Sequence, residues 1–406
     1  VGMQAVVFHG IGDIRLEEAP NPKVETASDA VVHLTASAIC GTDLHLVRGT
    51  VGPVKPGTIL GHEGVGIVES TGSEVRNFRS GDRVVVCSTI GCGICVYCRA
   101  GYYTQCDRAN PTGQGTAFFG GPELSGSFHG LQAQKARIPF AATTLVGIPA
   151  GVSDDQALVT SDIFPTGYFG ADLADIRPGR TVAVFGCGPV GQMAILSAKL
   201  MDAGRIFAVD TVPSRLEKAR AQGAETIDFN REDPVQALRD MTGGIGVDRA
   251  IDAVGVDAEH PRTASADAQR EFAREVHEIA PHAHPAHGPW RPGNGPSQVL
   301  AWAVEALAKA GRLAIIGVYP PAARTFPIGT AMNKNLTLRM GNCNHRKYVP
   351  RLLDLIAMGA ADPARLLTKS EPITAALEAY QAFDERRPGW LKVKLEPQQQ
   401  RQLRAA

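Results

Sequence analysis

The chain lacks an excess of charge of either sign. Its 406 residues include 41 lysines and arginines and 41 aspartates and glutamates, so the formal net charge is zero. Such a balance gives no indication of a nucleic acid or a charged membrane surface as a partner. We therefore expect neither a nucleic acid nor a membrane as a partner.

Long hydrophobic runs are absent as well. No stretch of about 18 apolar residues occurs, so no membrane-spanning helix is expected. The first residues, "VGMQAVVFHG", contain neither a basic segment nor a continuous apolar core, so we expect no secretory signal there. The expected location is the cytoplasm, where thiols stay mostly reduced, and this weighs against disulfides.

Cysteines are few, but four of the eight lie in one segment, "GCGICVYCRAGYYTQC". The spacing is C-x2-C-x2-C-x7-C, formed by Cys92, Cys95, Cys98 and Cys106. Four such thiolates can enclose one zinc ion, and a site with four protein ligands leaves no position for substrate. An iron–sulfur cluster is the rival, but in the ferredoxin pattern the fourth cysteine follows three residues after the third and precedes proline. The spacing favours a structural zinc, with unligated or disulfide-linked thiols as alternatives.

Two patterns of secondary structure divide the chain. Up to about residue 150, short strands alternate with glycine- and proline-containing turns, which predicts a β-rich, barrel-like unit. From Thr181, short apolar strands alternate with helices, which predicts βαβ units around a parallel sheet and an α/β fold. In this part the expected strands are 181–186, 205–210, 225–229, 247–254, 312–318 and 335–341, and the expected helices are 189–204, 213–223, 233–244 and 297–311.

A long segment at about 257–296 interrupts the second pattern. Insertions of this length are usually lids over functional sites or loops without fixed structure. The segment is rich in histidine, proline and glycine, and four of its histidines could bind a metal: His277, His282, His284 and His287. Helices are expected at 348–360 and 374–386, followed by a strand at 390–397 and a polar, frayed tail.

A glycine-rich motif, "VFGCGPVGQMA", follows the first strand of the βαβ part and begins a helix. Gly186, Gly188 and Gly191 have the G-x-G-x-x-G spacing, in which the glycines permit a tight turn, close approach of a pyrophosphate and helix packing. Asp210 ends the next strand about 20 residues further on, where a carboxylate binds a ribose 2′-OH and repels a 2′-phosphate. The motif therefore predicts NAD rather than NADP. The remaining residues expected to bind the cofactor are Pro189, Val190 and Arg215.

Three further segments hold residues that suit a metal. They are "ICGTDLHLVRG", "LGHEGVG" and "SDIFPTGYFG". Each has a simple structural explanation when it is read alone. Cys40 could be a core residue, His62 a hydrogen-bonded buried histidine, and Asp162 the cap of the following helix. The residues by themselves leave both interpretations open.

Taken together, these motifs resemble the zinc-containing medium-chain dehydrogenases of the alcohol dehydrogenase family. The resemblance covers nearly the whole chain, and its most specific stretch is "GHEGVGIVESTGSEVRNFRSGDRVV". "SDIFPTGY", with aspartate where many relatives have cysteine, and the insertion after "DAVG" make glutathione-independent formaldehyde dehydrogenases the most similar subgroup. The resemblance implies a GroES-like catalytic domain over 1–163 with a return at 343–406. It also implies a Rossmann NAD-binding domain over 164–342, with the insertion at about 257–296.

The resemblance also implies a second, catalytic zinc. Its ligands would be Cys40, His62 and Asp162, while Glu63 would lie behind the metal and Asp43 would orient His62. Zinc would act as a Lewis acid that lowers the pKa of the substrate hydroxyl, and a hydride would pass to NAD.

The same resemblance implies a proton relay. The hydroxyl proton would pass from Thr42 through the cofactor ribose to His45, whose residue type titrates near neutral pH. A plain surface position is the alternative for His45. Ser88, Thr89 and Ile90 are expected near the substrate.

The implied function is a zinc- and NAD-dependent dehydrogenase of a small alcohol or hydrated aldehyde, with two zinc ions per chain, assembled as a tetramer or dimer. An aldehyde dismutase with tightly bound NAD(H) and a non-catalytic NAD(H)-binding sensor are the alternatives. The region "GNCNHRKY" and the insertion match the family less clearly. In "RRPGWLKVKLEP", Trp390 and Leu391 stand in place of a basic phosphate-binding residue of many relatives.

Overall fold

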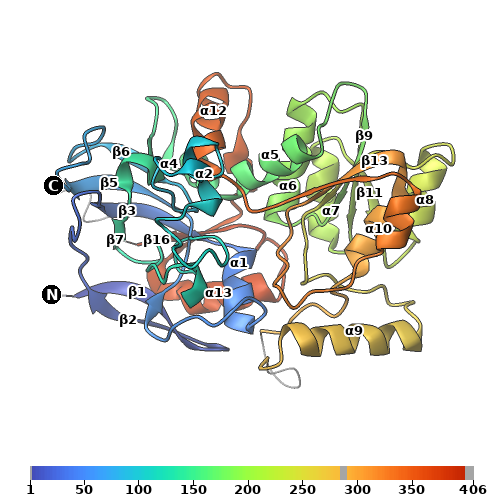
Figure 1. Ribbon diagram of the computed structural model, residues 1–406, viewed down its shortest axis with the longest axis horizontal. Helices are drawn as coiled ribbons and strands as arrows, with labels where there is room; N and C mark the ends of the chain where they lie inside the picture. The colour runs from blue at the N-terminus through green and yellow to red at the C-terminus, as the bar shows by residue number, and fades with distance from the viewer. Residues whose placement is uncertain (1, 284–289, 398–406) are drawn as a thin grey trace. The chain divides into compact units, whose positions relative to one another are not determined.

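The structure is a computed structural model that describes residues 2–283 and 290–397. The chain divides into two compact units (Figure 1). Unit 1 comprises Val1–Pro165, His287–Trp290 and Cys343–Ala406, and unit 2 comprises Thr166–Ala286 and Arg291–Asn342.

Unit 1 is built mainly from two β-sheets. A three-stranded sheet has the order β2-β1-β4, and a seven-stranded sheet has the order β15-β16-β3-β5-β6-β8, with β7 also paired to β3. The strands are β1 (Gly2–Gly10), β2 (Asp13–Pro20), β3 (Ala30–Ile39), β4 (Thr58–Ile59), β5 (Gly64–Thr71), β6 (Arg83–Val86), β7 (Lys135–Ile138), β8 (Leu145–Gly147), β15 (Lys369–Pro372) and β16 (Val393–Glu396).

The long strand β3 is the centre of the larger sheet. It pairs with β5, β7 and β16, and most of its side chains are buried. The strands pack so closely that a Cβ atom at Gly66 of β5 would lie 2.2 Å from the carbonyl oxygen of His33. A residue with a side chain would force the two strands apart, so this position requires glycine.

Short helices connect and cover the strands of unit 1. They are α1 (Gly41–Arg48), α2 (Val96–Arg99), α3 (Ala141–Thr144), α4 (Asp154–Val159), α12 (His345–Ala357) and α13 (Ala376–Asp384), with 3-10 turns η1 (Tyr103–Gln105), η2 (Glu123–Ser125), η3 (Pro363–Leu366) and η4 (Ile373–Ala375). Helix α5 (Ile163–Leu173) begins in unit 1 and continues in unit 2. Helix α1 follows β3 directly, so the end of a buried strand positions its first turn.

Unit 2 contains a six-stranded sheet in the order β11-β10-β9-β12-β13-β14, and all its pairings are parallel. The strands are β9 (Thr181–Phe185), β10 (Arg205–Asp210), β11 (Glu225–Asp228), β12 (Val247–Asp252), β13 (Leu307–Ile315) and β14 (Thr337–Met340). The helices are α6 (Pro189–Leu200), α7 (Pro213–Ala221), α8 (Pro234–Met241), α9 (Ala266–Ile279), α10 (Gln298–Ala306) and α11 (Ile328–Asn333).

Burial on both faces explains why the central strands β9 and β10 are largely apolar runs. In β9, Ala183 and Phe185 pack in one core cluster with residues of α8 and α10. Val182 and Val184 pack in a second cluster with residues of α6 and α7. The sheet is therefore covered by helices on both sides, as the alternation of strands and helices predicts.

Two expectations from the sequence are wrong in this unit. The helix expected over 297–311 ends at Ala306, and β13 begins at Leu307 rather than at residue 312. Leu307 pairs with Val247 of β12, and Ala310 has a left-handed φ of 58°, so a helix cannot continue there. Of the two alternatives for 257–296, a loop without fixed structure is wrong for Ala266–Ile279, which forms α9 after the Ser265 cap.

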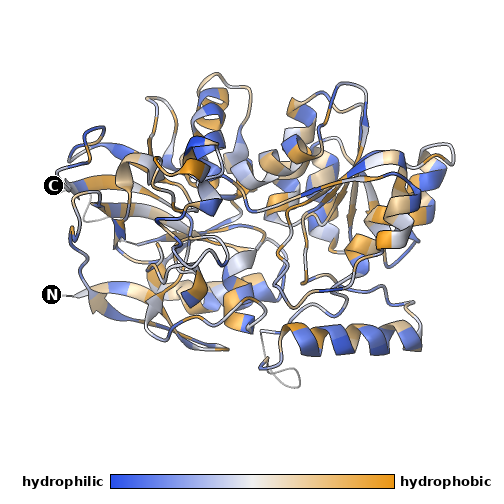
Figure 2. Cartoon of the chain, viewed as in Figure 1, coloured by the Kyte–Doolittle hydropathy of each residue, from blue (hydrophilic) through white to orange (hydrophobic). Residues whose placement is uncertain are grey.

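Helix α9 is amphipathic. Its half-buried or buried side chains recur at helical spacing, at Ala268, Phe272, Glu275, Val276 and Ile279. Orange and blue residues alternate along it in Figure 2.

The histidines of the insertion give no metal site in the part of the chain that is described. There, His277 and His282 join no group of three or more potential metal ligands. His284, His287 and the polar tail beyond Pro397 lie outside the described residues.

None of the helices in the described ranges is long and apolar enough to cross a membrane.

Candidate metal centres and cofactor site

The cysteine segment brings its four thiols together. The Sγ atoms of Cys92, Cys95, Cys98 and Cys106 all lie within 4.8 Å of one another, and the four cysteines are free. Backbone N–H groups point at the sulfurs: Cys92 N lies 3.2 Å from Cys106 Sγ, and Cys95 N lies 3.4 Å from Cys92 Sγ. N–H groups directed at sulfur stabilise thiolates, which are the form that binds a metal.

Electrostatics in this segment also suit a cation. Burial raises the pKa of Cys106 despite its backbone hydrogen bonds, whereas at Cys95 the N–H groups of Cys98 and Asp107 outweigh burial and lower the pKa to about 7. Four crowded thiols cannot all ionise alone, because like charges repel one another. A divalent cation removes that conflict, and the four-sulfur donor set fits zinc.

A second group of potential ligands lies at the end of β3. Donor atoms of Cys40, His62, Glu63 and Asp162 lie within 4.8 Å of one another, and all four residues are buried. Cys40 Sγ is 3.5 Å and His62 Nε2 is 3.2 Å from Asp162 Oδ2. A thiol, an imidazole nitrogen and carboxylate oxygens form the donor set that zinc takes in proteins, so the residues fit this metal.

Helix α1 supplies one ligand and the residue that orients another. Cys40 is the N-cap of α1, and its backbone N–H donates to Asp43 Oδ2 over 2.9 Å. Asp43 Oδ1 lies 3.1 Å from His62 Nδ1, which is the contact expected for a residue that orients His62. With Nδ1 directed at Asp43, the ring places Nε2 on the side of Cys40 and Asp162.

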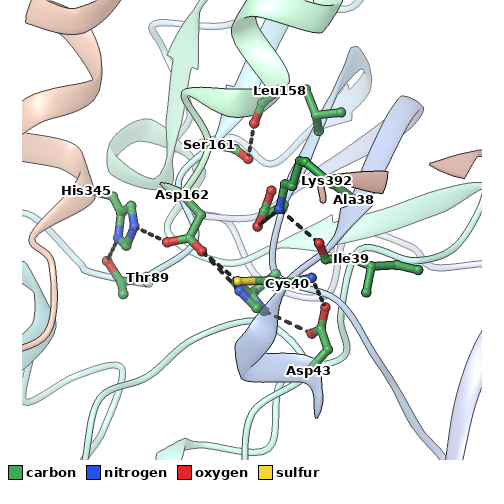
Figure 3. Close-up of polar contacts among 12 residues, drawn as sticks. Ala38, Ile39, Cys40, Asp43, Thr89, Leu158, Ser161, Asp162, His345 and Lys392 are labelled. Atoms are coloured by element: carbon green, nitrogen blue, oxygen red, sulfur yellow. Dashed lines mark hydrogen bonds and ion pairs between the residues drawn. The ribbon is translucent and has the colours of Figure 1, made fainter. Parts of the chain in front are cut away.

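Asp162 is held by a histidine that comes from a distant part of the chain. His345, the first residue of α12, places Nε2 2.8 Å from Asp162 Oδ1, while its Nδ1 lies 3.0 Å from Thr89 Oγ1 (Figure 3). Burial raises the pKa of Asp162, but hydrogen bonds with His345 and His62 reverse this and lower it well below its usual range. Asp162 is therefore held as a carboxylate, with Oδ2 on the side of Cys40 and His62.

Glu63 is held by a buried lysine. Lys392 Nζ lies 2.5 Å from Glu63 Oε1 and 3.0 Å from the carbonyl oxygen of Ile39, and both charged side chains are completely buried. Glu63 Oε2 has no hydrogen-bond partner within the described structure. A buried carboxylate oxygen without a partner is costly, so this atom points to a cation within reach.

Thr42 and His45 lie on α1, three residues apart and thus on neighbouring positions of one helix face. Thr42 is half-buried, whereas His45 is buried with Nδ1 2.8 Å from Thr50 Oγ1. The alternative of a plain surface position for His45 is therefore wrong. Of the residues expected near the substrate, Ser88, Thr89 and Ile90 are all buried.

The glycine motif forms the turn between β9 and α6 in unit 2. Gly186 has a φ of 88°, and a Cβ atom at Gly191 would lie 1.8 Å from the carbonyl oxygen of Gly186. Gly188 is the N-cap of α6, with Pro189 and Val190 in the first turn. A Cβ atom at Gly188 would project into space 4.0 Å from the guanidinium of Arg215. A helix N-terminus with free space beside an arginine fits the phosphates of a dinucleotide.

Asp210, the last residue of β10, is hydrogen-bonded to the same glycine turn. Its carboxylate accepts hydrogen bonds from the N–H groups of Cys187 (2.7 Å), Thr211 (2.7 Å) and Val212 (2.9 Å), and Arg215 Nη1 lies 3.9 Å away. A carboxylate offers about four acceptor positions, so one remains for a ribose hydroxyl.

Known proteins match this chain over nearly its whole length. Residues 26–150 match the model of alcohol dehydrogenase GroES-like domains, and residues 189–267 match that of zinc-binding dehydrogenases. An uncharacterised zinc-type alcohol dehydrogenase-like protein of Bacillus subtilis is 34% identical over 399 residues, which cover 97% of this chain and 100% of that protein. The chain belongs to the zinc-type alcohol dehydrogenase family.

Other relatives extend the comparison. The solved structure of an alcohol dehydrogenase from Thermus sp. ATN1 has a TM-score of 0.80 and 33% identity, covering 97% of this chain and 99% of that one. A glutathione-independent formaldehyde dehydrogenase of Pseudomonas aeruginosa is 35% identical over 269 residues, 63% of this chain and 66% of that protein. The predicted family and fold class are thus confirmed, and membership of this family implies an oxidoreductase that uses zinc and NAD(P).

Sequence reasoning missed two residues at the second candidate metal site, His345 and Lys392. Each lies in a segment that departs from the family pattern, "GNCNHRKY" for His345 and "RRPGWLKVKLEP" for Lys392. Their distance along the chain hides the contacts, because His345 is 183 residues from Asp162 and Lys392 is 329 residues from Glu63. The available signal was the departure from the family pattern itself.

Proposed function

We propose that the chain is a zinc-dependent, NAD-linked dehydrogenase that transfers a hydride between a small alcohol or hydrated aldehyde and NAD. The observation that carries this proposal is the buried group Cys40, His62 and Asp162, which offers sulfur, nitrogen and oxygen donors at one point. Three protein ligands leave one position of a tetrahedral zinc for a substrate, which is the composition of catalytic zinc sites. We assign the four-cysteine site to a second, structural zinc.

Zinc, when bound at this group, supplies a Lewis acid that lowers the pKa of a hydroxyl. The protein supplies the proton path and the orientation. We assign Thr42 Oγ1 as the acceptor of the hydroxyl proton and the ring of His45, a residue type that relays protons in enzymes, as the next carrier. Asp43 and His345 hold His62 and Asp162 in place.

The preference for NAD rests on Asp210. Its carboxylate is kept in place by three backbone N–H groups and would repel a 2′-phosphate. The match to a formaldehyde dehydrogenase favours formaldehyde as one substrate to test.

A substrate panel tests the proposal. The purified protein is assayed with NAD and NADP against primary and secondary alcohols, formaldehyde and longer aldehydes, and NADH formation is followed by absorbance. We expect reduction of NAD with at least one of these substrates and its loss in Cys40→Ala with one zinc retained. A product assay separates oxidation from dismutation, in which acid and alcohol form in equal amounts. A preparation with two zinc ions per chain that reduces NAD with none of them would contradict the proposal, and a single zinc per chain would favour the non-catalytic alternative.

A further inference from the structure

Helix α1 is held at both ends by one other helix, α13. At the start of α1, the Tyr380 hydroxyl donates to Gln132 Oε1 over 2.7 Å, and Gln132 Nε2 lies 3.3 Å from Asp43 Oδ2. At the end of α1, Arg48 forms an ion pair with Asp384, and both side chains are only 7% exposed. Because Tyr380 and Asp384 are four residues apart, they lie on the same face of α13.

One more residue, Trp290, contacts that face of α13. Its backbone N–H donates to Asp384 Oδ2 over 3.0 Å, and its ring meets the Tyr380 ring edge-on with centroids 6.4 Å apart. The indole also packs against the apolar cluster that contains Leu46 and Val47 of α1. Trp290 thus touches both residues with which α13 holds α1.

Trp290 reaches this position by an unusual route. It belongs to the insertion at 257–296, which follows β12 of unit 2, yet it is part of unit 1, and Arg291 belongs to unit 2 again. Its φ of 73° lies in the left-handed region, which a bulky residue adopts only when its surroundings enforce it. The contacts with Asp384 and Tyr380 are those surroundings.

We infer that Trp290 is a positioning residue for the candidate catalytic zinc site. It holds Tyr380 and Asp384 in place, α13 then holds both ends of α1, and Asp43 of α1 orients His62. The buried path from Trp290 to the metal ligand consists of Tyr380, Gln132 and Asp43. The insertion therefore has a function inside the catalytic unit, whatever else it covers. The inference rests on the proposed zinc site but requires no particular substrate.

Cobalt absorption tests this inference without an enzyme assay. Co²⁺ is introduced at the Cys40 site of full-length protein that retains zinc in the four-cysteine site. The visible absorption spectrum of the bound Co²⁺ and the rate at which a chelator removes it are then recorded. We expect Trp290→Ala to change the spectrum and to speed metal loss about tenfold, the lower end of what outer-shell residues contribute. Trp290→Phe, which keeps an aromatic ring against Tyr380, should retain most of the wild-type behaviour, whereas the backbone N–H that bonds Asp384 is present in both variants.

A matched control and a second variant separate positioning from general destabilisation. Phe272→Ala removes an aromatic ring of the same insertion that stacks on His260 in unit 2, and it should leave the cobalt signals unchanged. Tyr380→Phe removes the hydroxyl that contacts Gln132 and should alter the spectrum in the same direction. Because both residues act on one path, the double variant should be no worse than the stronger single one.

Several results would overturn the inference. They are unchanged cobalt signals in Trp290→Ala, fully additive effects in the double variant, or an equal response to Phe272→Ala. If Trp290→Ala does not fold, Trp290→Leu takes its place, and thermal unfolding checks each variant.

With an active substrate, kcat should fall while KM for NAD stays the same, because the glycine motif belongs to unit 2. Absence of any dehydrogenase activity would contradict the proposed function but not this inference, since the cobalt readouts need neither substrate nor NAD.

Discussion

Replacing His345 by phenylalanine should weaken binding of the candidate catalytic zinc without affecting the other zinc. The substitution keeps a flat ring of similar size but removes the Nε2 atom that lies 2.8 Å from Asp162 Oδ1. Asp162 then loses the donor that fixes which of its oxygens lies toward Cys40 and His62.

The expected size of this effect follows from the bond that is lost. A hydrogen bond to a charged group contributes about 1.5–3 kcal/mol, and about 1.4 kcal/mol corresponds to a factor of ten in affinity. Zinc affinity should therefore fall about 10- to 100-fold, the range typical of residues that orient metal ligands. His345→Gln, whose amide can still donate to Asp162, should fall between wild type and His345→Phe.

Chelator competition measures this affinity directly. The zinc in the four-cysteine site is the internal control, because its ligands belong to one continuous segment. Thr89→Val removes the hydroxyl 3.0 Å from the other ring nitrogen and should produce a smaller change. If His345→Phe binds both zinc ions as tightly as wild type, Asp162 does not depend on His345 and the reasoning is refuted.

Three other outcomes are expected. Asp29→Asn should lower the free energy of unfolding by about 2 kcal/mol at neutral pH. Burial raises the pKa of Asp29, but hydrogen bonds from Arg137 and Thr26 lower the pKa overall. The difference in unfolding free energy between variant and wild type is therefore complete above about pH 4 and shrinks as the pH falls toward the lowered pKa of the folded state. Denaturant unfolding over that pH range measures this difference, and a constant value would argue against an ionised Asp29. Cys98→Ser should release one zinc and lower the melting temperature, because structural zinc contributes to folding; retention of both ions in metal analysis would rule out the assigned site. Asp210→Ser should reduce the preference for NAD over NADP about tenfold, the effect of about 1.4 kcal/mol of lost repulsion, as measured by kcat/KM for each cofactor; an unchanged ratio would show that Asp210 does not select the cofactor.

Local patterns explain why much of the architecture is predictable from the sequence. β10 has the expected bounds, 205–210, because an apolar run between turn residues specifies a short strand. The glycine motif and the cysteine segment are equally local, since each is complete within a few turns of chain. At Leu307, strand pairing with the distant Val247 determines the structure, so the local pattern wrongly extends the preceding helix past Ala306.

The shell around the second candidate metal site is different in kind. Cys40, His62 and Asp162 were found only through the resemblance to a family, because each residue has an ordinary structural explanation by itself. His345 and Lys392 lie outside that resemblance, and no spacing rule links them to residues so distant along the chain. Only the packed structure brings a lone histidine and a lone lysine to these buried carboxylates.

The two metal sites also differ in how much of the chain must exist before each can form. The cysteine site spans the 14 positions between Cys92 and Cys106, whereas Cys40 and Asp162 are 122 positions apart. Short loops close with a smaller loss of entropy than long ones and form earlier in folding. During synthesis the four thiols can therefore come together soon after residue 106 has been added. The second candidate site acquires His345 and Lys392 only when the chain is almost finished, so we expect a truncated chain to form the first of these sites without the second.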